Sequence, residues 1–270
     1  MILTRTEIAT SAESPWLRVF RRSARPKIRL LCFPHAGGAA SMFRTWADRL
    51  PGETEVWAVC LPGREQRLAE RPADRIDAVL DGVWRAVESL LEVPLVLFGH
   101  SMGAIMALEF AHHMRDTRCV EPHRLIISAA APGRAFGEDF RYASDAELLT
   151  TIAKSWGALP DEVLASVEMR SMILATMRAD LHLLATCYRN HPSPLTCAID
   201  ALGGADDHSI PASVLEGWCG HTNGPFSLKM FPGGHMFIAA PNARSFLDVI
   251  CERLTRVVNG QEERGCDAAG

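Results

Sequence analysis

Short apolar segments alternate along the chain with longer segments in which apolar positions recur at helical spacing. The apolar segments are rich in branched residues and end at Gly, Pro or a small residue, which is typical of buried strands. Strands that alternate with amphipathic helices indicate an α/β domain with a mostly parallel sheet. The expected strands are residues 28–33, 56–60, 95–98, 125–129, 197–202 and 228–231, and the expected helices are residues 42–50, 75–91, 102–114, 214–218 and 243–258.

One block interrupts this alternation. Between residues 136 and 190 no strand pattern occurs and helical patterns follow one another, the first opening with Ser144 and Glu147 at the spacing of a capping box. The block has more apolar positions than a helix needs to pack on a sheet through one narrow apolar stripe. Two interpretations stay open: the helices are additional core, or they form a lid whose apolar underside, rich in flexible methionines, covers a substrate.

The chain of 270 residues suits one large domain with an insertion. We expect an N-terminal extension at residues 1–27, an α/β domain at residues 28–258 with its helical insertion at about 136–190, and a flexible polar tail at residues 259–270. The net charge of −4 gives no broad positive surface for phosphates, so nucleic acid is not an expected partner.

The eight cysteines lie far apart, without a C-x-x-C pair or the histidine spacing of a zinc site, which indicates reduced thiols and no bound metal. The apolar runs are far shorter than the roughly 20 residues that cross a bilayer, and no signal-peptide pattern follows the basic N-terminal residues. We therefore expect a cytoplasmic protein with no membrane contact.

The segment Gly99-His100-Ser101-Met102-Gly103 matches the pattern G-x-S-x-G. It lies between an expected strand and an expected helix, which is the context in which a sharp turn exposes a nucleophilic serine. Side chains at the two glycines would clash with the neighbouring strand and helix. The helix N-terminus beside Ser101 favours negative charge. Ser101 is the candidate nucleophile.

A second small-residue loop, F-P-H-A-G-G-A-A at residues 33–40, also joins a strand to a helix. It lacks the G-K-[ST] ending of a P-loop and the G-x-G-x-x-G of a dinucleotide fold, so we favour a backbone N–H that binds an oxyanion, that of Ala36, over a phosphate site. His35 in this loop is either a structural histidine or a direct catalyst.

Two further strand ends carry an acid and a base. Asp206 and Asp207 follow the strand at residues 197–202, and His235 follows the last strand on a Gly-rich loop. The chain order serine, acid, histidine is that of α/β-hydrolases. A serine hydroxyl needs an imidazole to take its proton, and the imidazole needs a carboxylate to fix its tautomer. The residues alone leave Asp206 and Asp207 as alternatives.

Taken together, these motifs resemble those of the stand-alone type II thioesterases of polyketide and nonribosomal peptide synthesis, which are α/β-hydrolases. The resemblance covers about residues 28–254. It rests on F-P-H-A-G-G-A-A (33–40), L-P-G-R-E-Q-R (61–67), G-H-S-M-G-A (99–104), M-R-A-D-L (177–181) with Tyr188, the G-x-x-D turn (204–207) and G-G-H-M-F (233–237).

The resemblance implies an α/β-hydrolase fold with a mobile lid, and a triad of Ser101, His235 and Asp207, since the family acid stands three residues after the glycine. It implies Ala36 and Met102 as oxyanion amides. His35, Gly37, Met236 and Phe237 are expected at the substrate. The implied substrate is an acyl group, stalled or misprimed, on the phosphopantetheine of an acyl or peptidyl carrier protein, with no cofactor. We expect a monomer that meets its carrier protein transiently.

The fold and triad do not fix the leaving group, so a general acyl-CoA thioesterase or a small-molecule esterase is the alternative. An acidic carrier protein would need a basic surface on this chain. The candidates are Arg64, Arg67, Arg71 and the cluster at residues 21–27, although Arg64 could instead pair with a buried carboxylate.

Overall fold

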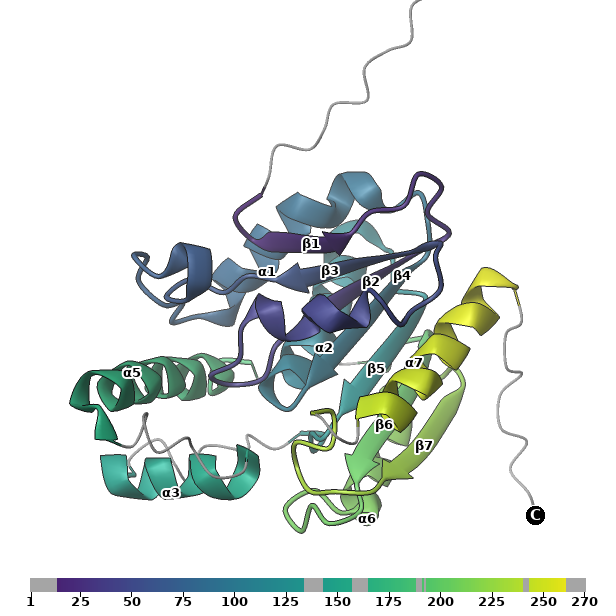
Figure 1. The fold of residues 1–270 in the computed structure, drawn as a ribbon. Coiled ribbons are helices and arrows are strands. Elements are labelled where there is room, and N and C mark those ends of the chain that lie inside the picture. Colours follow the sequence, from purple (N-terminus) through teal and green to yellow (C-terminus); the bar gives the residue numbers. More distant parts are fainter. Residues whose placement is uncertain are drawn as a thin grey trace, which may run out of the picture.

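The computed structural model describes residues 14–133, 143–156, 165–187, 191, 193–239 and 243–260. Their centre is a seven-stranded sheet with the order β1-β3-β2-β4-β5-β6-β7 (Figure 1). All neighbouring strands are parallel except β1, which pairs antiparallel with β3. The α/β class with a mostly parallel sheet is thus confirmed. The strands are β1 (Leu17–Arg21), β2 (Ile28–Phe33), β3 (Thr54–Val59), β4 (Leu95–His100), β5 (Arg124–Ser128), β6 (Ala198–Gly204) and β7 (Phe226–Phe231).

Helices cover both faces of the sheet. On one face lie α1 (Ile76–Val87) and α2 (Met102–Arg118), packed on a core that includes Leu31 and Phe33 of β2. On the other face lie η1 (Ala40–Trp46), a 3₁₀ helix, and α7 (Ala243–Val258), packed on a core that includes Leu30 and Cys32. Successive residues of β2 thus enter opposite cores, which is why central parallel strands are apolar at every position. The shorter helices are η2 (Glu65–Arg67), η3 (Glu88–Leu90), α6 (Ala212–Leu215) and η4 (Glu216–His221).

Several elements differ from the sequence prediction. The helix expected at residues 42–50 is the 3₁₀ helix η1, and those expected at 75–91 and 214–218 each divide into an α-helix and a 3₁₀ turn. Strand β1 was not predicted, and it lies within the segment expected to be an N-terminal extension. Its sequence, L-R-V-F-R, mixes apolar and charged positions because an edge strand is only half covered, so it lacks the apolar run that marked the other strands.

The helical block contains α3 (Asp145–Trp156) and α5 (Val167–Leu184), which lie side by side beyond one end of the sheet (Figure 1). The capping box is present: the Ser144 N–H donates to Glu147 Oε2 at 2.7 Å, and the Glu147 N–H donates to Ser144 Oγ at 3.3 Å. The two helices share a separate apolar cluster (Leu148, Ile152, Leu174, Met177 and Leu181). Residues 136–142, 157–164, 188–190 and 261–270, with Tyr188 among them, lie outside the described residues.

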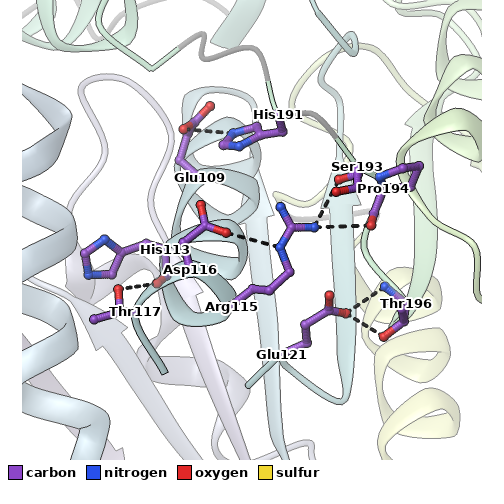
Figure 2. Close-up of polar contacts among 10 residues, drawn as sticks. All are labelled: Glu109, His113, Arg115, Asp116, Thr117, Glu121, His191, Ser193, Pro194 and Thr196. Carbon is purple, nitrogen blue, oxygen red and sulfur yellow. Dashed lines mark hydrogen bonds and ion pairs between the residues drawn. The ribbon is translucent and has the colours of Figure 1, made fainter. Parts of the chain in front are cut away.

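The segment that leads into β6 is attached to the outer end of α2 and the loop after it (Figure 2). Arg115 donates from Nη1 to the carbonyls of Ser193 and Pro194 at 3.0 and 3.2 Å. Glu121 accepts the Thr196 N–H at 2.7 Å. These contacts hold the start of β6 beside β5, and they therefore fix where the acidic turn after β6 emerges at the opposite edge of the sheet.

The seven cysteines in the described part of the chain are all free thiols, of which Cys119 and Cys219 are exposed and Cys251 is half-buried. Among the described helices, none combines the length and the apolar character that crossing a bilayer requires.

Candidate active site

Ser101 occupies the sharp turn between β4 and α2. Its φ of 55° and ψ of −121° are unfavourable for a residue with a side chain, and such strain is typical of functional positions. A Cβ atom on Gly99 would lie 2.1 Å from the carbonyl oxygen of Gly103, and one on Gly103 would lie 2.1 Å from that of Phe33. Only glycine fits at either place. The two glycines let helix and strands approach closely and leave the Ser101 hydroxyl at the carboxyl edge of the sheet.

Three side chains form a chain of hydrogen bonds at this edge. His235 Nε2 lies 3.1 Å from Ser101 Oγ, and His235 Nδ1 lies 2.7 Å from Asp207 Oδ2. The three residues follow β4, β7 and β6, so the carboxyl ends of three strands bring them together. Asp207 and His235 are both less than a tenth exposed. In this arrangement His235 can take the proton of the Ser101 hydroxyl while Asp207 orients the ring.

The loops that carry the acid and the base are joined to each other. The Ala205 N–H donates to the Phe231 carbonyl at 2.7 Å, and the Asp206 N–H donates to that of Gly233 at 2.9 Å. The Asp206 carboxylate accepts the Gly233 N–H at 3.1 Å and is exposed, whereas Asp207 faces His235. The two neighbouring acids therefore make different contacts: Asp206 links the two loops by hydrogen bonds, and Asp207 contacts the imidazole.

The second oxygen of Asp207 is also bound. Oδ1 accepts the hydroxyl of Ser209 at 2.5 Å, the Ser209 N–H at 3.0 Å and the Ile210 N–H at 3.3 Å. Burial alone raises the pKa of Asp207, but hydrogen bonds from His235 and Ser209 outweigh it, so this pKa lies below its ordinary value. Asp207 is thus ionised at neutral pH. Ser209 was not predicted, although a serine two residues after an aspartate is a familiar turn signal.

Two further imidazoles pack near His235. His35 donates from Nδ1 to the Ala36 carbonyl at 2.8 Å, and burial lowers its pKa. His100 lies 2.9 Å from Ser128 Oγ through Nδ1, and burial lowers its pKa well below the ordinary value. Both are neutral at pH 7. Within the described residues, His235 is the imidazole in hydrogen-bond contact with Ser101, which favours the structural interpretation of His35.

The two amides expected to bind the oxyanion belong to Met102 and Ala36. Met102 is the first residue of α2, and an N–H at this position has no partner inside the helix. Ala36 follows β2, which lies next to β4 in the sheet. Phe33 of β2 is paired with Gly99 of β4. The expected oxyanion amides therefore belong to segments that follow the carboxyl ends of adjacent strands. Their role stays a prediction.

The loop after Ala36 is bound to a buried ion pair that the sequence did not predict as a unit. Asp180 of α5 accepts the Gly37 N–H on Oδ2 at 2.6 Å. Arg64 donates to both carboxylate oxygens of Asp180, at 2.8 and 2.5 Å, and to the Gly38 carbonyl at 2.9 Å. Arg64 thus has the structural role left open above. The clue to Asp180 was a lone acid among apolar positions of a helix.

The structure corrects two of the basic docking candidates. Arg64 and Arg67 are both less than a tenth exposed. Arg67 donates to the Cys60 carbonyl at 2.8 Å and to Glu70 at 2.8 and 2.6 Å. An arginine that is buried and already paired within its own chain is not available to a partner, so the idea that these two residues bind a carrier protein is wrong.

Two of the expected substrate contacts make contacts within the chain. The Gly37 N–H is occupied by Asp180, and Phe237 is 1% exposed, with its ring stacked on Phe231 at 5.3 Å between centroids. Phe237 is therefore a core residue. Met236 is half-buried beside His235, and His35 is buried in the loop that follows β2. The described residues contain no group of three His, Cys, Asp or Glu that could hold a metal ion.

Comparison with known proteins places this site in a family. Residues 28–256 match the model of the thioesterase domain. The chain is 32% identical over 234 residues to the gramicidin S biosynthesis protein GrsT of Aneurinibacillus migulanus, which covers 86% of this chain and 91% of that protein.

Two solved structures are similar over most of their length. RedJ, a thioesterase from the prodiginine pathway of Streptomyces coelicolor, is 34% identical with a TM-score of 0.77, covering 85% of this chain and 87% of RedJ. The type II thioesterase BorB from the borrelidin biosynthetic cluster is 31% identical with a TM-score of 0.76, covering 90% of this chain and 98% of BorB. Because the family model matches most of this chain, the chain belongs to the thioesterase domain family, in the branch of type II thioesterases that serve modular peptide and polyketide synthesis.

Proposed function

We propose that this thioesterase removes stalled or misprimed acyl groups from the phosphopantetheine of acyl or peptidyl carrier proteins, with Ser101 as nucleophile, His235 as base and Asp207 as orienting acid. The observation that carries the proposal is the unbroken chain of hydrogen bonds from Ser101 through His235 to Asp207. The amides of Ala36 and Met102 are the proposed oxyanion donors. No cofactor is required, since these groups supply every proton transfer and charge stabilisation.

In the acylation step Ser101 Oγ attacks the thioester carbon while His235 Nε2 takes the hydroxyl proton. The carbonyl oxygen becomes an oxyanion, which the two amides stabilise, and the ionised Asp207 stabilises the imidazolium. The C–S bond then breaks, and the proton on Nε2 passes to the departing sulfur. The products are an acyl ester on Ser101 and the free phosphopantetheine thiol.

In the deacylation step a water molecule takes the place of the thiol. His235, neutral again, accepts a proton from the water as it attacks the acyl carbon. The tetrahedral intermediate uses the same two amides. Collapse breaks the bond to Ser101 Oγ, which regains the proton from His235, and the acyl group leaves as a carboxylic acid.

The carrier-protein substrate is supported by the relatives. GrsT is named for gramicidin S biosynthesis, and BorB is a type II thioesterase of a biosynthetic cluster. We infer that α3 and α5 belong to a lid over the site, since their shared apolar cluster is separate from the two cores of the sheet and packs against Ala36. The protein is proposed to act as a cytoplasmic monomer that binds carrier proteins transiently.

The test is deacylation of a panel of acyl-phosphopantetheinyl carrier proteins, followed by mass spectrometry, beside the same acyl groups on CoA and on simple alcohols. The expected result is faster release from carrier proteins, with a loss of several orders of magnitude in Ser101→Ala because the triad residues act as a unit. Full activity in Ser101→Ala would exclude the mechanism. Turnover confined to CoA thioesters or free esters would instead support the general acyl-CoA thioesterase or esterase.

A further inference from the structure

The two glycines that follow Ala36 are held from both sides by charged groups. The Gly37 N–H donates to Asp180 Oδ2 at 2.6 Å, and the Gly38 carbonyl accepts from Arg64 Nη1 at 2.9 Å. These contacts fix the orientation of the peptide groups directly after the proposed oxyanion donor. Gly37 has a φ of 72°, so its backbone is not held in place by the sterics of a side chain. The loop has hydrogen bonds of its own, from the Gly38 N–H to the His35 carbonyl at 2.9 Å and from His35 Nδ1 to the Ala36 carbonyl at 2.8 Å, and Asp180 and Arg64 add a restraint from outside it.

The restraint comes from two distant segments of the chain. Arg64 lies in the loop after β3, and Asp180 lies 116 residues further on, in α5 of the helical block. The side chains of Arg64 and Asp180 are only 9% and 2% exposed. Arg64 makes a two-pronged pair with the carboxylate, and the same Asp180 Oδ2 that it binds also accepts the Gly37 N–H.

Stability alone explains this pair poorly. Moving two charges out of water costs several kcal/mol per ion, and well-packed apolar residues often serve as well or better. What a two-pronged guanidinium–carboxylate pair supplies is direction, because the planar fork sets the angle as well as the distance. Here the directed groups are the N–H of Gly37 and the carbonyl of Gly38.

Apolar packing connects the same helix to Ala36. The cluster formed by α3 and α5 includes Met177 and Leu181, which flank Asp180 along α5, and Ala36 packs against this cluster. The residue that is proposed to donate the oxyanion amide thus contacts the helical block through its side chain, while the next residue contacts it through the N–H. The position of α5 and the conformation of the oxyanion loop are therefore coupled.

We propose that Asp180 and Arg64 are positioning residues of the hydrolysis: they hold the Ala36–Gly37 and Gly38–Ala39 peptide groups so that the Ala36 N–H faces the oxyanion, and they thereby make the docking of α5 a condition for fast catalysis. The inference rests on the proposed function in that it takes Ala36 as an oxyanion donor. Neither residue touches the reacting atoms. Their effect is on how well the transition state is bound.

A second buried ion pair provides the control. Arg124, at the start of β5, donates to Asp200 of β6 at 2.8 Å, with side-chain exposures of 5% and 1%. This pair lies near the amino ends of strands, whereas Ser101 follows the carboxyl end of β4. Loss of Asp180 removes the charge partner of Arg64, and loss of Asp200 removes that of Arg124 and one contact of Arg253 at 3.5 Å. Asp200→Asn therefore reproduces the loss of a buried pair without touching the oxyanion loop.

The experiment compares Asp180→Asn with Asp200→Asn in the full chain. For hydrolysis of an acyl-CoA and an acyl carrier protein, we expect kcat of Asp180→Asn to fall about 30–300-fold, the range between a misplaced and a missing oxyanion donor. KM should stay within about threefold, and the pH dependence of kcat should be unchanged because the triad is intact. Asp200→Asn should lose thermal stability but keep kcat within about twofold. Arg64→Lys, which keeps the charge but loses the fork, should fall between the wild type and Asp180→Asn.

Two further readouts do not depend on thioester turnover. The rate of labelling by a fluorophosphonate should fall in Asp180→Asn in parallel with kcat, since phosphonylation of Ser101 uses the same oxyanion amides. In ¹⁵N–¹H spectra, the Gly37 amide proton should move upfield in Asp180→Asn when its carboxylate acceptor is lost. A folded Asp180→Asn with wild-type kcat and labelling would overturn the proposal, as would an equal loss of kcat in Asp200→Asn.

The same readouts separate this proposal from the proposed function. If the wild-type protein labels at Ser101 but hydrolyses no thioester, the function fails, and the labelling rates of the two variants still decide whether Asp180 positions the loop. If the wild type hydrolyses thioesters through Ser101 and Asp180→Asn does so equally well, the function stands and the positioning role is wrong.

Discussion

Ser101 and Asp207 are each held by backbone groups as well as by the hydrogen bond to His235. Ser101 keeps a φ of 55° because its N–H is bound to the Ser128 carbonyl at 2.8 Å and glycines stand two positions to either side. Asp207 is held by two N–H groups and a hydroxyl of its own turn. The hydrogen bonds of the triad therefore form between groups that are already oriented, which lowers the reorganisation needed during the reaction.

The two adjacent acids allow a matched test of this arrangement. Asp207→Asn should lower kcat by about 10³–10⁴-fold, because an amide no longer holds the imidazole in the tautomer that accepts the serine proton. Asp206→Asn should lower it by less than about fivefold, since the Asp206 carboxylate contacts the Gly233 N–H rather than the imidazole. Steady-state hydrolysis of an acyl-CoA measures both. Equal losses in the two variants would contradict the assignment of Asp207.

Residues in local motifs could be found from the sequence, and residues in long-range pairs could not. Ser101 was predicted because the need for glycine on both sides is visible within five positions. The partner of Arg64 was not, since a buried ion pair between residues 116 apart depends on how α5 packs. The same limit explains Phe237, whose burial against Phe231 depends on the path of the loop after β7.

Strand β1 completes one edge of the sheet, and Arg21 at its end binds a ring of backbone carbonyls. Arg21 donates from Nε to Thr54 at 2.9 Å, and from the terminal nitrogens to Leu50 at 3.1 Å, to Pro51 at 2.5 Å and to Ala47. These carbonyls belong to the connection between η1 and β3 and to the first residue of β3. Arg21 therefore closes the connection that follows the oxyanion loop.

Removal of this guanidinium should be costly. Arg21→Met leaves several half-buried carbonyls without their donor, and at about 1–3 kcal/mol for an unsatisfied buried group we expect the free energy of unfolding to fall by about 2–4 kcal/mol. Arg25→Met, in the exposed turn before β2, should change it by less than about 0.5 kcal/mol. Urea unfolding measures both. A change below 1 kcal/mol in Arg21→Met would mean that β1 is dispensable to the domain.

Helix α2 carries a buried imidazole that makes stability depend on pH. The ring of His112 is stacked on that of His191 at 3.5 Å between centroids, and His191 contacts Glu109 at 3.2 Å (Figure 2). Burial, with the nearby His191 and Arg115, lowers the pKa of His112 from 6.5 to about 3. Between these values the unfolded chain binds a proton that the folded protein does not, so stability falls as the pH drops below about 6.5.

The slope for one such group is at most about 1.4 kcal/mol per pH unit. His112→Phe keeps an aromatic ring against His191 but has no proton to bind, so its free energy of unfolding should fall about 1 kcal/mol less than that of the wild type between pH 7 and pH 5.5. His208→Gln, at an exposed histidine, is the control and should keep the wild-type dependence. Urea titrations at the two pH values measure the difference; identical slopes in wild type and His112→Phe would contradict it.

Strands in the middle of the sheet were predictable because they are buried on both faces and read as apolar runs, and β7, at one edge, was found from its apolar residues 228, 230 and 231. Strand β1, at the other edge, was missed. The 3₁₀ helix η1 was expected to be an α-helix, since apolar spacing over seven residues barely separates periods of 3.0 and 3.6. The capping box of α3 was found because its residues are three positions apart.

Across the whole molecule, the exposed basic residues differ in whether they follow the carboxyl ends of the strands, as Ser101 does, or precede the amino ends. This difference refines where a carrier protein is expected to bind. Arg71 follows η2, after the carboxyl end of β3, and its side chain is 87% exposed. Lys27 precedes β2, at the amino edge far from Ser101, and is also exposed. Of the basic candidates named from the sequence, Arg71 thus belongs to a connection that starts at the carboxyl end of a strand, as Ser101 does, and Lys27 to one that ends at the amino end of a strand.

Charge reversal should distinguish the two positions. Arg71→Glu should raise KM for an acyl carrier protein by roughly 3–10-fold at low salt, since rim charges act through encounter and are screened as salt rises. It should leave KM for the matching acyl-CoA unchanged. Lys27→Glu should affect neither substrate. A carrier-protein KM that is insensitive to Arg71→Glu would place the docking surface elsewhere.

The distribution of cysteines has a practical consequence for an enzyme whose product is a thiol. Burial raises the pKa of Cys60 to about 11 and of Cys197 to about 12, so both stay protonated and poorly nucleophilic at neutral pH. Cys119 and Cys219 are exposed, the first at the end of α2 and the second in η4. Neither belongs to the turn that carries Ser101 or to the loop that carries Ala36. Native alkylation should reach these two first among the described cysteines and spare hydrolysis, which makes them ready attachment points for fluorophores that report on carrier-protein binding.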